Sequence, residues 1–186
     1  MSFKKNYKKV YNFIFNDDSV WSWIVNILLA FVIVKFLIYP GLGLVLGTDY
    51  PMVAVISGSM EHNGLNFDQW WDENGQWYID HGISRVDFED YIIHNGFNKG
   101  DVIILRGKQD YSLGDIVVYQ SSFASYPVIH RVTYINDSEN TLIVKGDNND
   151  SPDPYDVDYD LIEGVAAFKI PYIGWVKILF TELTGI

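Results

Sequence analysis

The sequence predicts a mainly β protein, in which an antiparallel β domain is preceded by one N-terminal transmembrane helix. Three observations lead to this prediction. Residues 21–39 are almost entirely apolar, six short apolar or β-branched runs follow them between turn signals, and none of the 186 residues is a cysteine. About 140 residues after the apolar stretch are enough to bury a core without disulfides.

The charges of the chain are unevenly distributed. There are 13 Lys and Arg against 24 Asp and Glu, a formal net charge of −11. Residues 1–46 hold five lysines and two aspartates, a net charge of +3, whereas the remainder holds eight basic and 22 acidic residues, a net charge of −14. This balance argues against a general nucleic-acid binder, which needs basic residues to displace counterions from phosphates.

The apolar stretch WSWIVNILLAFVIVKFLIY covers 19 residues, from Trp21 to Tyr39. As a helix it is about 28 Å long, close to the hydrocarbon thickness of a bilayer. Aromatic residues at both ends suit the two interfaces, and four lysines before the stretch predict a cytoplasmic N-terminus. A buried core helix and a cleaved signal peptide are the alternatives. Pro40, Gly41 and Gly43 are expected to end the helix.

These features divide the chain into three expected parts. Residues 1–18 form a basic cytoplasmic N-terminus, and residues 19–46 form the transmembrane anchor and a linker. Residues 47–186 form a β-rich domain outside the cytoplasm. The protein would then cross the cell membrane once.

The expected strands of the β domain are the six apolar or β-branched runs. Gly-Asp pairs lie beside several of them, where both residues favour turns. Runs spaced this closely predict antiparallel pairing. The expected strands are Met52–Ile56, Val102–Leu105, Ile116–Tyr119, Val128–Ile135, Thr141–Val144 and Val165–Ile170.

Two further segments each admit two interpretations. Residues 62–98 are rich in Trp and Tyr among acids and glycines, which fits a packed surface insertion with a short helix in its second half, or else a lid or membrane-facing loop. Ile170–Phe180 is too short to span a bilayer. It is expected to be a closing strand, with an interfacial segment that uses Tyr172, Trp175 and Lys177 as the alternative.

Three elements could carry chemistry. Ser57-Gly58-Ser59-Met60 follows the first strand, in a turn that could expose a serine hydroxyl near backbone N–H groups. A serine nucleophile needs a base, and His130 lies in the apolar strand Pro127–Val132. Each feature alone is more often structural, since Ser-Gly turns and strand histidines are common.

The third element is the acidic loop from Lys145 to Asp153. Asp147 or Asp153 could orient an imidazole and stabilise its charged form. A plain Asp/Asn turn and a calcium loop are the alternatives, although the run of aspartates lacks the 12-residue register of a hand-type calcium site.

In chain order these elements give a serine after an anchor, a histidine 71 residues later, and aspartates 17 or 23 residues beyond it. This order resembles type I signal peptidases, specifically the archaeal and endoplasmic-reticulum branch, which uses serine and histidine where bacterial members use serine and lysine. The resemblance covers most of the chain. Its boxes are Ser57–Met60, Gly100-Asp101, Gly114–Val118, Pro127–Val132, Lys145–Asn149 and Pro171–Gly174.

The chain departs from the family pattern at two places. His62 stands where the family often has proline, two residues after the methionine of the first box. The insertion at 62–98 is far longer than in eukaryotic members and resembles the archaeal subgroup.

The resemblance implies a role for each candidate residue. Ser59 would be the nucleophile and His130 its general base, with the Ser57 hydroxyl and the Ser59 backbone N–H as the oxyanion hole. Asp153 matches the position of the acidic partner of His130, and Asp147 is the second choice. A neutral imidazole can deprotonate the serine without a metal, so no cofactor is expected.

The implied function is endopeptidase cleavage of signal peptides after a small-x-small motif, through an acyl-enzyme. The implied partners are signal peptides of secretory preproteins, the lipid bilayer and, as a candidate, the protein translocation machinery, but no nucleic acid. One alternative is a non-catalytic, membrane-anchored acidic surface domain that binds calcium or a partner protein. Another is a self-cleaving or regulatory serine peptidase, which would rely on a lysine base, and no lysine takes the strand position of His130.

Overall fold

The computed structural model describes residues 2–107, 110–122, 124–175 and 178–179. The chain divides into two compact units, Met1–Val45 and Leu46–Ile186. The division falls between the expected anchor and the expected β domain.

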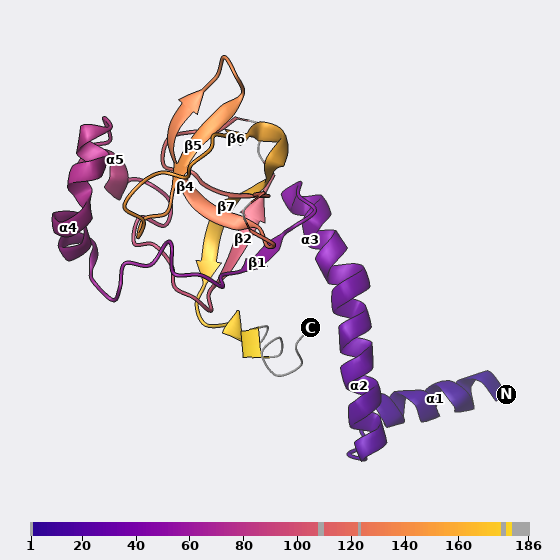
Figure 1. The fold of residues 1–186 in the computed structure, drawn as a ribbon. Coiled ribbons are helices and arrows are strands. Elements are labelled where there is room, and N and C mark those ends of the chain that lie inside the picture. The colour runs from indigo at the N-terminus through magenta and orange to yellow at the C-terminus, as the bar shows by residue number, and fades with distance from the viewer. Residues whose placement is uncertain (1, 108–109, 123, 176–177, 180–186) are drawn as a thin grey trace. The chain divides into compact units, whose positions relative to one another are not determined.

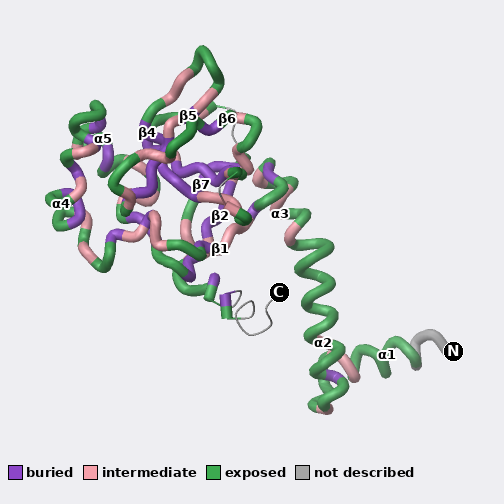
Figure 2. Tube along the Cα trace, in the orientation of Figure 1, coloured by how far each residue is buried: buried purple, intermediate pink, exposed green. Residues whose placement is uncertain are grey.

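The first unit contains one long apolar helix. It begins as α2 (Val20–Ile33), passes through the π-helical turn η1 (Val34–Ile38) and ends as α3 (Tyr39–Leu46). Its 27 residues, Val20–Leu46, form the one helix of the described chain that is long and apolar enough to cross a membrane. Figure 2 shows that it is exposed over most of its length, as a helix that faces lipid would be.

The expected helix break at Pro40 is wrong, because the helix continues to Leu46. Proline has no N–H to donate and crowds the preceding turn. The structure accommodates Pro40 with the wider π turn just before it, in which the Tyr39 N–H bonds to the Val34 carbonyl. Backbone groups in an apolar environment must stay bonded, so a widened helix is preferred to an open break.

A second helix, α1 (Ser2–Phe15), precedes the long helix and was not predicted from the sequence. The junction is held by side chains of α2 that bond to the last carbonyls of α1. The Ser22 hydroxyl donates to the Phe13 carbonyl at 2.5 Å, and the Asn26 amide donates to the Ile14 carbonyl at 2.8 Å. These bonds satisfy carbonyls that a helix end leaves unpaired.

The second unit is built on a seven-stranded antiparallel sheet in the order β1-β2-β7-β3-β4-β5-β6 (Figure 1). The predicted fold class is confirmed, and every expected strand is present. A short strand, β6, was not expected, and β7 begins three residues before the expected run. The strands are β1 (Met52–Ala54), β2 (Val102–Arg106), β3 (Ile116–Tyr119), β4 (Val128–Asn136), β5 (Thr141–Lys145), β6 (Val157–Asp158) and β7 (Ile162–Ile170), with a 3₁₀ turn, η2 (Tyr159–Leu161), before β7.

The central strand β3 is buried on both faces, which explains its uninterrupted apolar sequence. Ile116 and Val118 belong to one core cluster with Met60. Val117 and Tyr119 belong to a second cluster on the other face. Register shifts in β2, β3 and β4 bend the ladders, because an irregular residue increases local twist.

The insertion between β1 and β2 is more helical than expected. It holds α4 (Phe67–Asp80) and the short α5 (Arg85–Glu89), and only the second was anticipated. Both begin with a capping box, Asn66 with Gln69 and Ser84 with Asp87. Their aromatic residues form a core of their own, made of Trp70, Trp71, Tyr78, Ile83 and Phe88. Figure 1 shows the two helices beside the sheet, next to β4.

The expected closing strand at Ile170–Phe180 is wrong. The last strand ends at Ile170, and the described residues after Gly174 are helical. Pro171 cannot donate to a strand ladder, and Tyr172 has a left-handed φ of 65°. Lys177 and Phe180 lie outside the described residues, and the interfacial alternative stays a prediction.

Candidate active site

The nucleophile candidate lies in the loop after the edge strand β1. Ser59 is partly exposed, whereas Met60 beside it is buried in the core. The Met60 carbonyl accepts a bond from the Phe97 N–H at 3.0 Å, and the Glu61 N–H closes a turn onto the Gly58 carbonyl at 3.1 Å. A buried residue on one side and a closed turn on the other hold the Ser59 hydroxyl toward solvent.

Ser57 and Ser59 face each other across the turn. Their hydroxyl oxygens are 3.3 Å apart, and either can be the donor. Within the described residues, Ser57 is the hydrogen-bond partner of the Ser59 hydroxyl. The pair therefore places a second hydroxyl beside the candidate nucleophile, as an oxyanion donor requires.

His130 lies near the start of β4 and pairs with Val117 of β3. Only 6% of the residue is exposed. Its Nδ1 is 2.8 Å from Asp153 Oδ2. Since a carboxylate only accepts, Nδ1 carries the proton when the imidazole is neutral, and the lone pair on Nε2 is available to take a proton.

Asp153 is held by more than its bond to His130. Its backbone N–H donates to the Val144 carbonyl at 2.9 Å, and the Tyr119 hydroxyl donates to the same Oδ2 that faces His130. Burial first, and then the bond to Asp153, raise the pKa of the Tyr119 hydroxyl well above its usual value. This hydroxyl therefore stays protonated and keeps the carboxylate in place.

Ser59 and His130 line the same pocket, which has a volume of about 210 Å³. Its walls come from the segment around β1 and from the segment that leads into β4, and they are mostly apolar. In the described structure the Ser59 hydroxyl bonds to Ser57 and not to the His130 ring. In enzymes without substrate, this catalytic bond is often long and tightens only in the complex.

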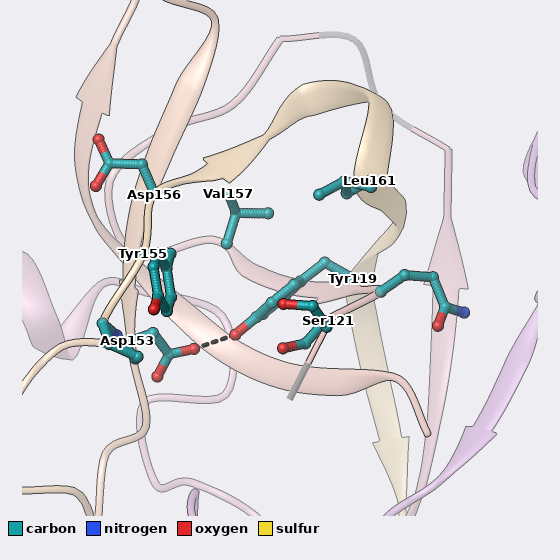
Figure 3. Close-up of a pocket in the computed structure, with 10 residues that line it drawn as sticks. Tyr119, Ser121, Asp153, Tyr155, Asp156, Val157 and Leu161 are labelled. Atoms are coloured by element: carbon teal, nitrogen blue, oxygen red, sulfur yellow. Dashed lines mark hydrogen bonds between the residues drawn. The ribbon is translucent and has the colours of Figure 1, made fainter. Parts of the chain in front are cut away.

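A larger cavity of about 390 Å³ has Asp153 in its wall, whereas the lining of the smaller pocket does not include Asp153. Figure 3 shows the Tyr119 hydroxyl directed at Asp153 in its wall, with Tyr155 and Val157 nearby. Neither Ser59 nor His130 lines this cavity. The smaller pocket, which holds both residues, is therefore the better candidate for the chemistry.

Asp147 has different partners from Asp153. It is completely buried, and both of its oxygens accept bonds from Arg131, at 2.8 Å from Nε and 2.7 Å from a terminal nitrogen. Burial alone would raise the pKa of the Asp147 carboxyl, but the Arg131 charge holds that pKa well below its usual range. Tyr78 and His62 also bond to this carboxylate, so its described bonds do not include His130.

The loop that carries Asp147 supports the candidate nucleophile directly. The Asn148 N–H donates to the Ser59 carbonyl at 2.8 Å, and the Asn148 side chain donates to the Gly58 carbonyl at 3.0 Å. Gly146 has no room for a side chain, because a Cβ there would lie 2.6 Å from the Ser59 carbonyl oxygen. The acidic loop and the serine loop are thus packed backbone against backbone.

The remaining acids of this loop and of the segment that follows it, up to residue 160, do not gather around a common point. Within the described residues, no three His, Asp or Glu side chains lie close enough to hold a metal ion. Asp150, Asp156, Asp158 and Asp160 are exposed. No arrangement in this loop favours the calcium-binding alternative.

Sequence reasoning missed four residues that organise the site: His62, Tyr78, Tyr119 and Arg131. Arg131 follows His130 directly, so in a strand its side chain points to the opposite face. A buried arginine needs a carboxylate partner. An arginine within the apolar strand was therefore the sequence signal that an aspartate such as Asp147 would be buried beside it. Nothing in the sequence indicates that Tyr78, from a distant helix, reaches the same carboxylate.

No protein-family model matches the chain, but individual relatives do. The signal peptidase complex catalytic subunit sec11 of Schizosaccharomyces pombe is 31% identical over 169 residues, which is 86% of this chain and 82% of that protein. SEC11 of Komagataella phaffii is 30% identical over 164 residues, 79% of this chain and 76% of its own. The chain belongs to the signal peptidase family.

Proteins of the same name from other fungi are also similar to this chain. SEC11 of Colletotrichum graminicola is 30% identical over 160 residues, 79% of this chain and 73% of that protein. The resemblance expected from the sequence boxes is therefore confirmed for the endoplasmic-reticulum side of the branch. These relatives are eukaryotic and give no support to an archaeal origin.

Proposed function

We propose that this signal peptidase cleaves its substrates with Ser59 as the nucleophile, His130 as the general base and Asp153 as the orienting carboxylate. The chain is an enzyme of the serine hydrolase type that removes signal peptides. The observation that carries the residue assignment is the 2.8 Å bond between His130 Nδ1 and Asp153, in a pocket that His130 shares with Ser59.

The first step forms an acyl-enzyme. Nε2 of His130 takes the proton of Ser59 while the serine oxygen attacks the scissile carbonyl carbon. Asp153 stabilises the imidazolium that results. The protonated imidazole then gives its proton to the leaving amine, the C–N bond breaks, and the signal peptide stays on Ser59 as an ester.

The second step reverses these roles with water as the nucleophile. His130 takes a proton from water, which attacks the ester, and Ser59 regains its proton as the signal peptide leaves. In both steps the negative oxygen would be held by the Ser57 hydroxyl and the Ser59 backbone N–H. Each such donor contributes a rate factor of about 10²–10³ in comparable hydrolases.

The pocket also supports a proposal about the substrate. The segments 54–57 and 126–129 both line it, and β1 forms one edge of the sheet. An extended peptide can add to such an edge through backbone bonds. Alternate side chains of that peptide would enter the small, mostly apolar pocket, which suits small residues at two alternate positions before the cleavage site.

The helix Val20–Leu46 supports a single membrane crossing. From the lysines before it we infer a cytoplasmic N-terminus and a β domain on the other side of the cell membrane. Because the active-site loop begins about ten residues after the helix, as an extended chain it lies within about 35 Å of the lipid. A signal peptide emerging from the bilayer would meet it there.

The partners of the enzyme are also proposed. The relatives are named as catalytic subunits of a complex, so we propose that this chain works beside further subunits and the protein translocation machinery, on preproteins in transit. The long insertion at 62–98 is the feature that favours the archaeal subgroup, and membership of that subgroup stays a prediction for this chain.

The residue assignment is tested by replacing each of the three side chains in the full chain. Ser59→Ala, His130→Ala and Asp153→Ala are each expected to abolish cleavage of a preprotein in detergent, with thermal midpoints close to wild type. Ser138→Ala and His81→Ala are matched controls, because both residues are exposed and neither lines the pocket. Full cleavage by Ser59→Ala would overturn the choice of nucleophile.

A further inference from the structure

The helical insertion reaches the acidic loop through two buried polar side chains. The Tyr78 hydroxyl, from α4, donates to Asp147 Oδ1 at 3.1 Å. Nε2 of His62, at the start of the insertion, lies 3.3 Å from Asp147 Oδ2. Tyr78 and Asp147 have no exposed surface, and His62 is 4% exposed. Because the Asp147 carboxylate is ionised, both side chains act as donors to it.

These contacts differ from what packing alone requires. The insertion already has an aromatic core, and His62 is stacked on Trp70 with ring centroids 3.9 Å apart. Burying a hydroxyl or a ring N–H costs free energy unless the group finds a hydrogen-bond partner. Apolar side chains at these two positions would cover the sheet without that cost. Here both polar atoms meet the same carboxylate, and with Arg131 they give it four donors.

Asp147 in turn sets the position of the backbone behind the nucleophile. Its own N–H faces the Met60 sulfur at 3.4 Å, so the residue is fixed at both ends. The next residue, Asn148, bonds to the carbonyls of Ser59 and Gly58. A shift of Asp147 would therefore be transmitted through Asn148 to the turn that carries the Ser59 hydroxyl.

We infer that Tyr78 and His62 are positioning residues for the peptidase reaction, and that the helical insertion serves as a brace that holds the serine loop through Asp147. The inference rests on the proposed assignment of Ser59. Neither Tyr78 nor His62 lines the substrate pocket, most of whose wall comes from other segments, and the brace reaches that wall at the serine loop. Its loss should therefore slow acylation and leave substrate affinity almost unchanged.

The first test compares two single-hydroxyl deletions in the full chain, with a preprotein as substrate. Tyr78→Phe keeps the ring in the aromatic core and removes one donor to Asp147. We expect kcat to fall by about tenfold, with KM changed by less than about twofold. Tyr91→Phe is the matched control, because Tyr91 packs against the same core but is not a partner of Asp147, and its kcat should equal wild type.

The second test uses His62, which lies before α4 and stacks on Trp70 of that helix. His62→Ala should lower kcat at nearly constant KM, and His62→Gln, whose amide can donate from a similar place, should recover part of the loss. Asn148→Ala removes the side-chain bond to Gly58, the last link of the proposed path. Combined with Tyr78→Phe, it should cost less than the sum of the two single changes, because both act on one path.

Each outcome decides the inference. A Tyr78→Phe enzyme with wild-type kcat, or one whose loss appears in KM, overturns it, and so does a loss equal to that of Tyr91→Phe. Additive effects of Tyr78→Phe and Asn148→Ala overturn the path through the loop. In all of these cases Ser59→Ala remains inactive if the proposed function holds, so failure of the brace is distinct from failure of the nucleophile assignment.

Discussion

Asp147 and Asp153 are six residues apart in one acidic loop, but their surroundings differ. Asp153 is partly exposed, with 16% of its side chain accessible, and accepts bonds from His130 and Tyr119. Asp147 is completely buried against the Arg131 guanidinium. The Asp153 carboxylate can stabilise an imidazole that gains and loses a proton. The Asp147 carboxylate neutralises a buried cation permanently. The proposed division of roles between the two aspartates follows from this contrast.

Removal of the Asp147 charge should destabilise the fold. Asp147→Asn leaves the Arg131 guanidinium buried without a counter-charge, which costs about 3–5 kcal/mol in comparable pairs. We expect a clearly lower thermal midpoint for the full chain in detergent at pH 7. Asp72→Asn, on the exposed face of α4, should leave the midpoint unchanged, and equal midpoints for both variants would contradict the role of Asp147.

The same carboxylate predicts an acid dependence. Its pKa in the folded chain is held below the ordinary value of an aspartate, which is about 4. The stabilisation is therefore fully present above about pH 4 and is lost as the pH falls further toward the folded-state pKa. Thermal midpoints measured between pH 7 and pH 2.5 should fall more steeply for wild type than for Asp147→Asn. Parallel curves would contradict this.

At the scale of elements, the serine loop after β1 and the acidic loop after β5 depend on close backbone contact. Gly146 lies so near the Ser59 carbonyl that a Cβ would be 2.6 Å from its oxygen and 2.8 Å from the Asn149 side-chain nitrogen. One of these loops must move to admit any other residue. The two loops are in contact although four strands separate β1 from β5 in the sheet.

Gly146→Ala should therefore reduce activity more than stability. The added methyl group would displace the Ser59 backbone, and a displacement of about 1 Å in an active site can cost about 10² in rate. The measurement is kcat on a preprotein, with the thermal midpoint in parallel. Gly41→Ala is the control, because a Cβ there meets no atom within 4 Å. A Gly146→Ala enzyme with normal kcat would show that the loop contact does not position the nucleophile.

At the scale of the whole molecule, the proposed orientation puts the β domain on the far side of the membrane from the N-terminus. The turn between β4 and β5 holds the acceptor sequence Asn136-Asp137-Ser138. Asn136 is partly exposed and accepts a bond from the Ser138 hydroxyl at 2.7 Å. Glycosylation of such a site requires a domain that is exposed on the side of the membrane away from the cytoplasm.

Expression in endoplasmic-reticulum vesicles tests this orientation. A second acceptor sequence, Asn149-Asp150-Ser151, begins at a residue that lines the pocket. We expect a glycosylated form of the full chain that disappears in Asn136→Gln and remains in Asn149→Gln. An unmodified chain whose β domain is digested by protease added outside the vesicles would contradict the proposed orientation.

Six of the seven strands were predictable because each contains an apolar or β-branched run, whereas β6 has only two residues, Val157 and Asp158. Helix α4 was not, because its sequence, FDQWWDENGQWYID, mixes acids, a glycine and aromatic residues and has low average helix propensity. Its stability comes from packing of Trp70, Trp71 and Tyr78 within the aromatic core, which is a tertiary effect. The prediction of a closing strand at Ile170–Phe180 was wrong for a related reason, because apolar residues in that segment fit either a strand or a helical turn.

The sequence by itself determined the apolar helix, the antiparallel β class and the family, because hydrophobic periodicity, turn residues and ordered boxes are local properties of the chain. It also nominated Ser59, His130 and the acidic loop. Only the tertiary structure decided how the two aspartates differ, since their partners Arg131, Tyr78 and Tyr119 come from three separate elements. Pairing across such distances depends on how the sheet and the insertion fold together, and no single stretch of sequence contains that information.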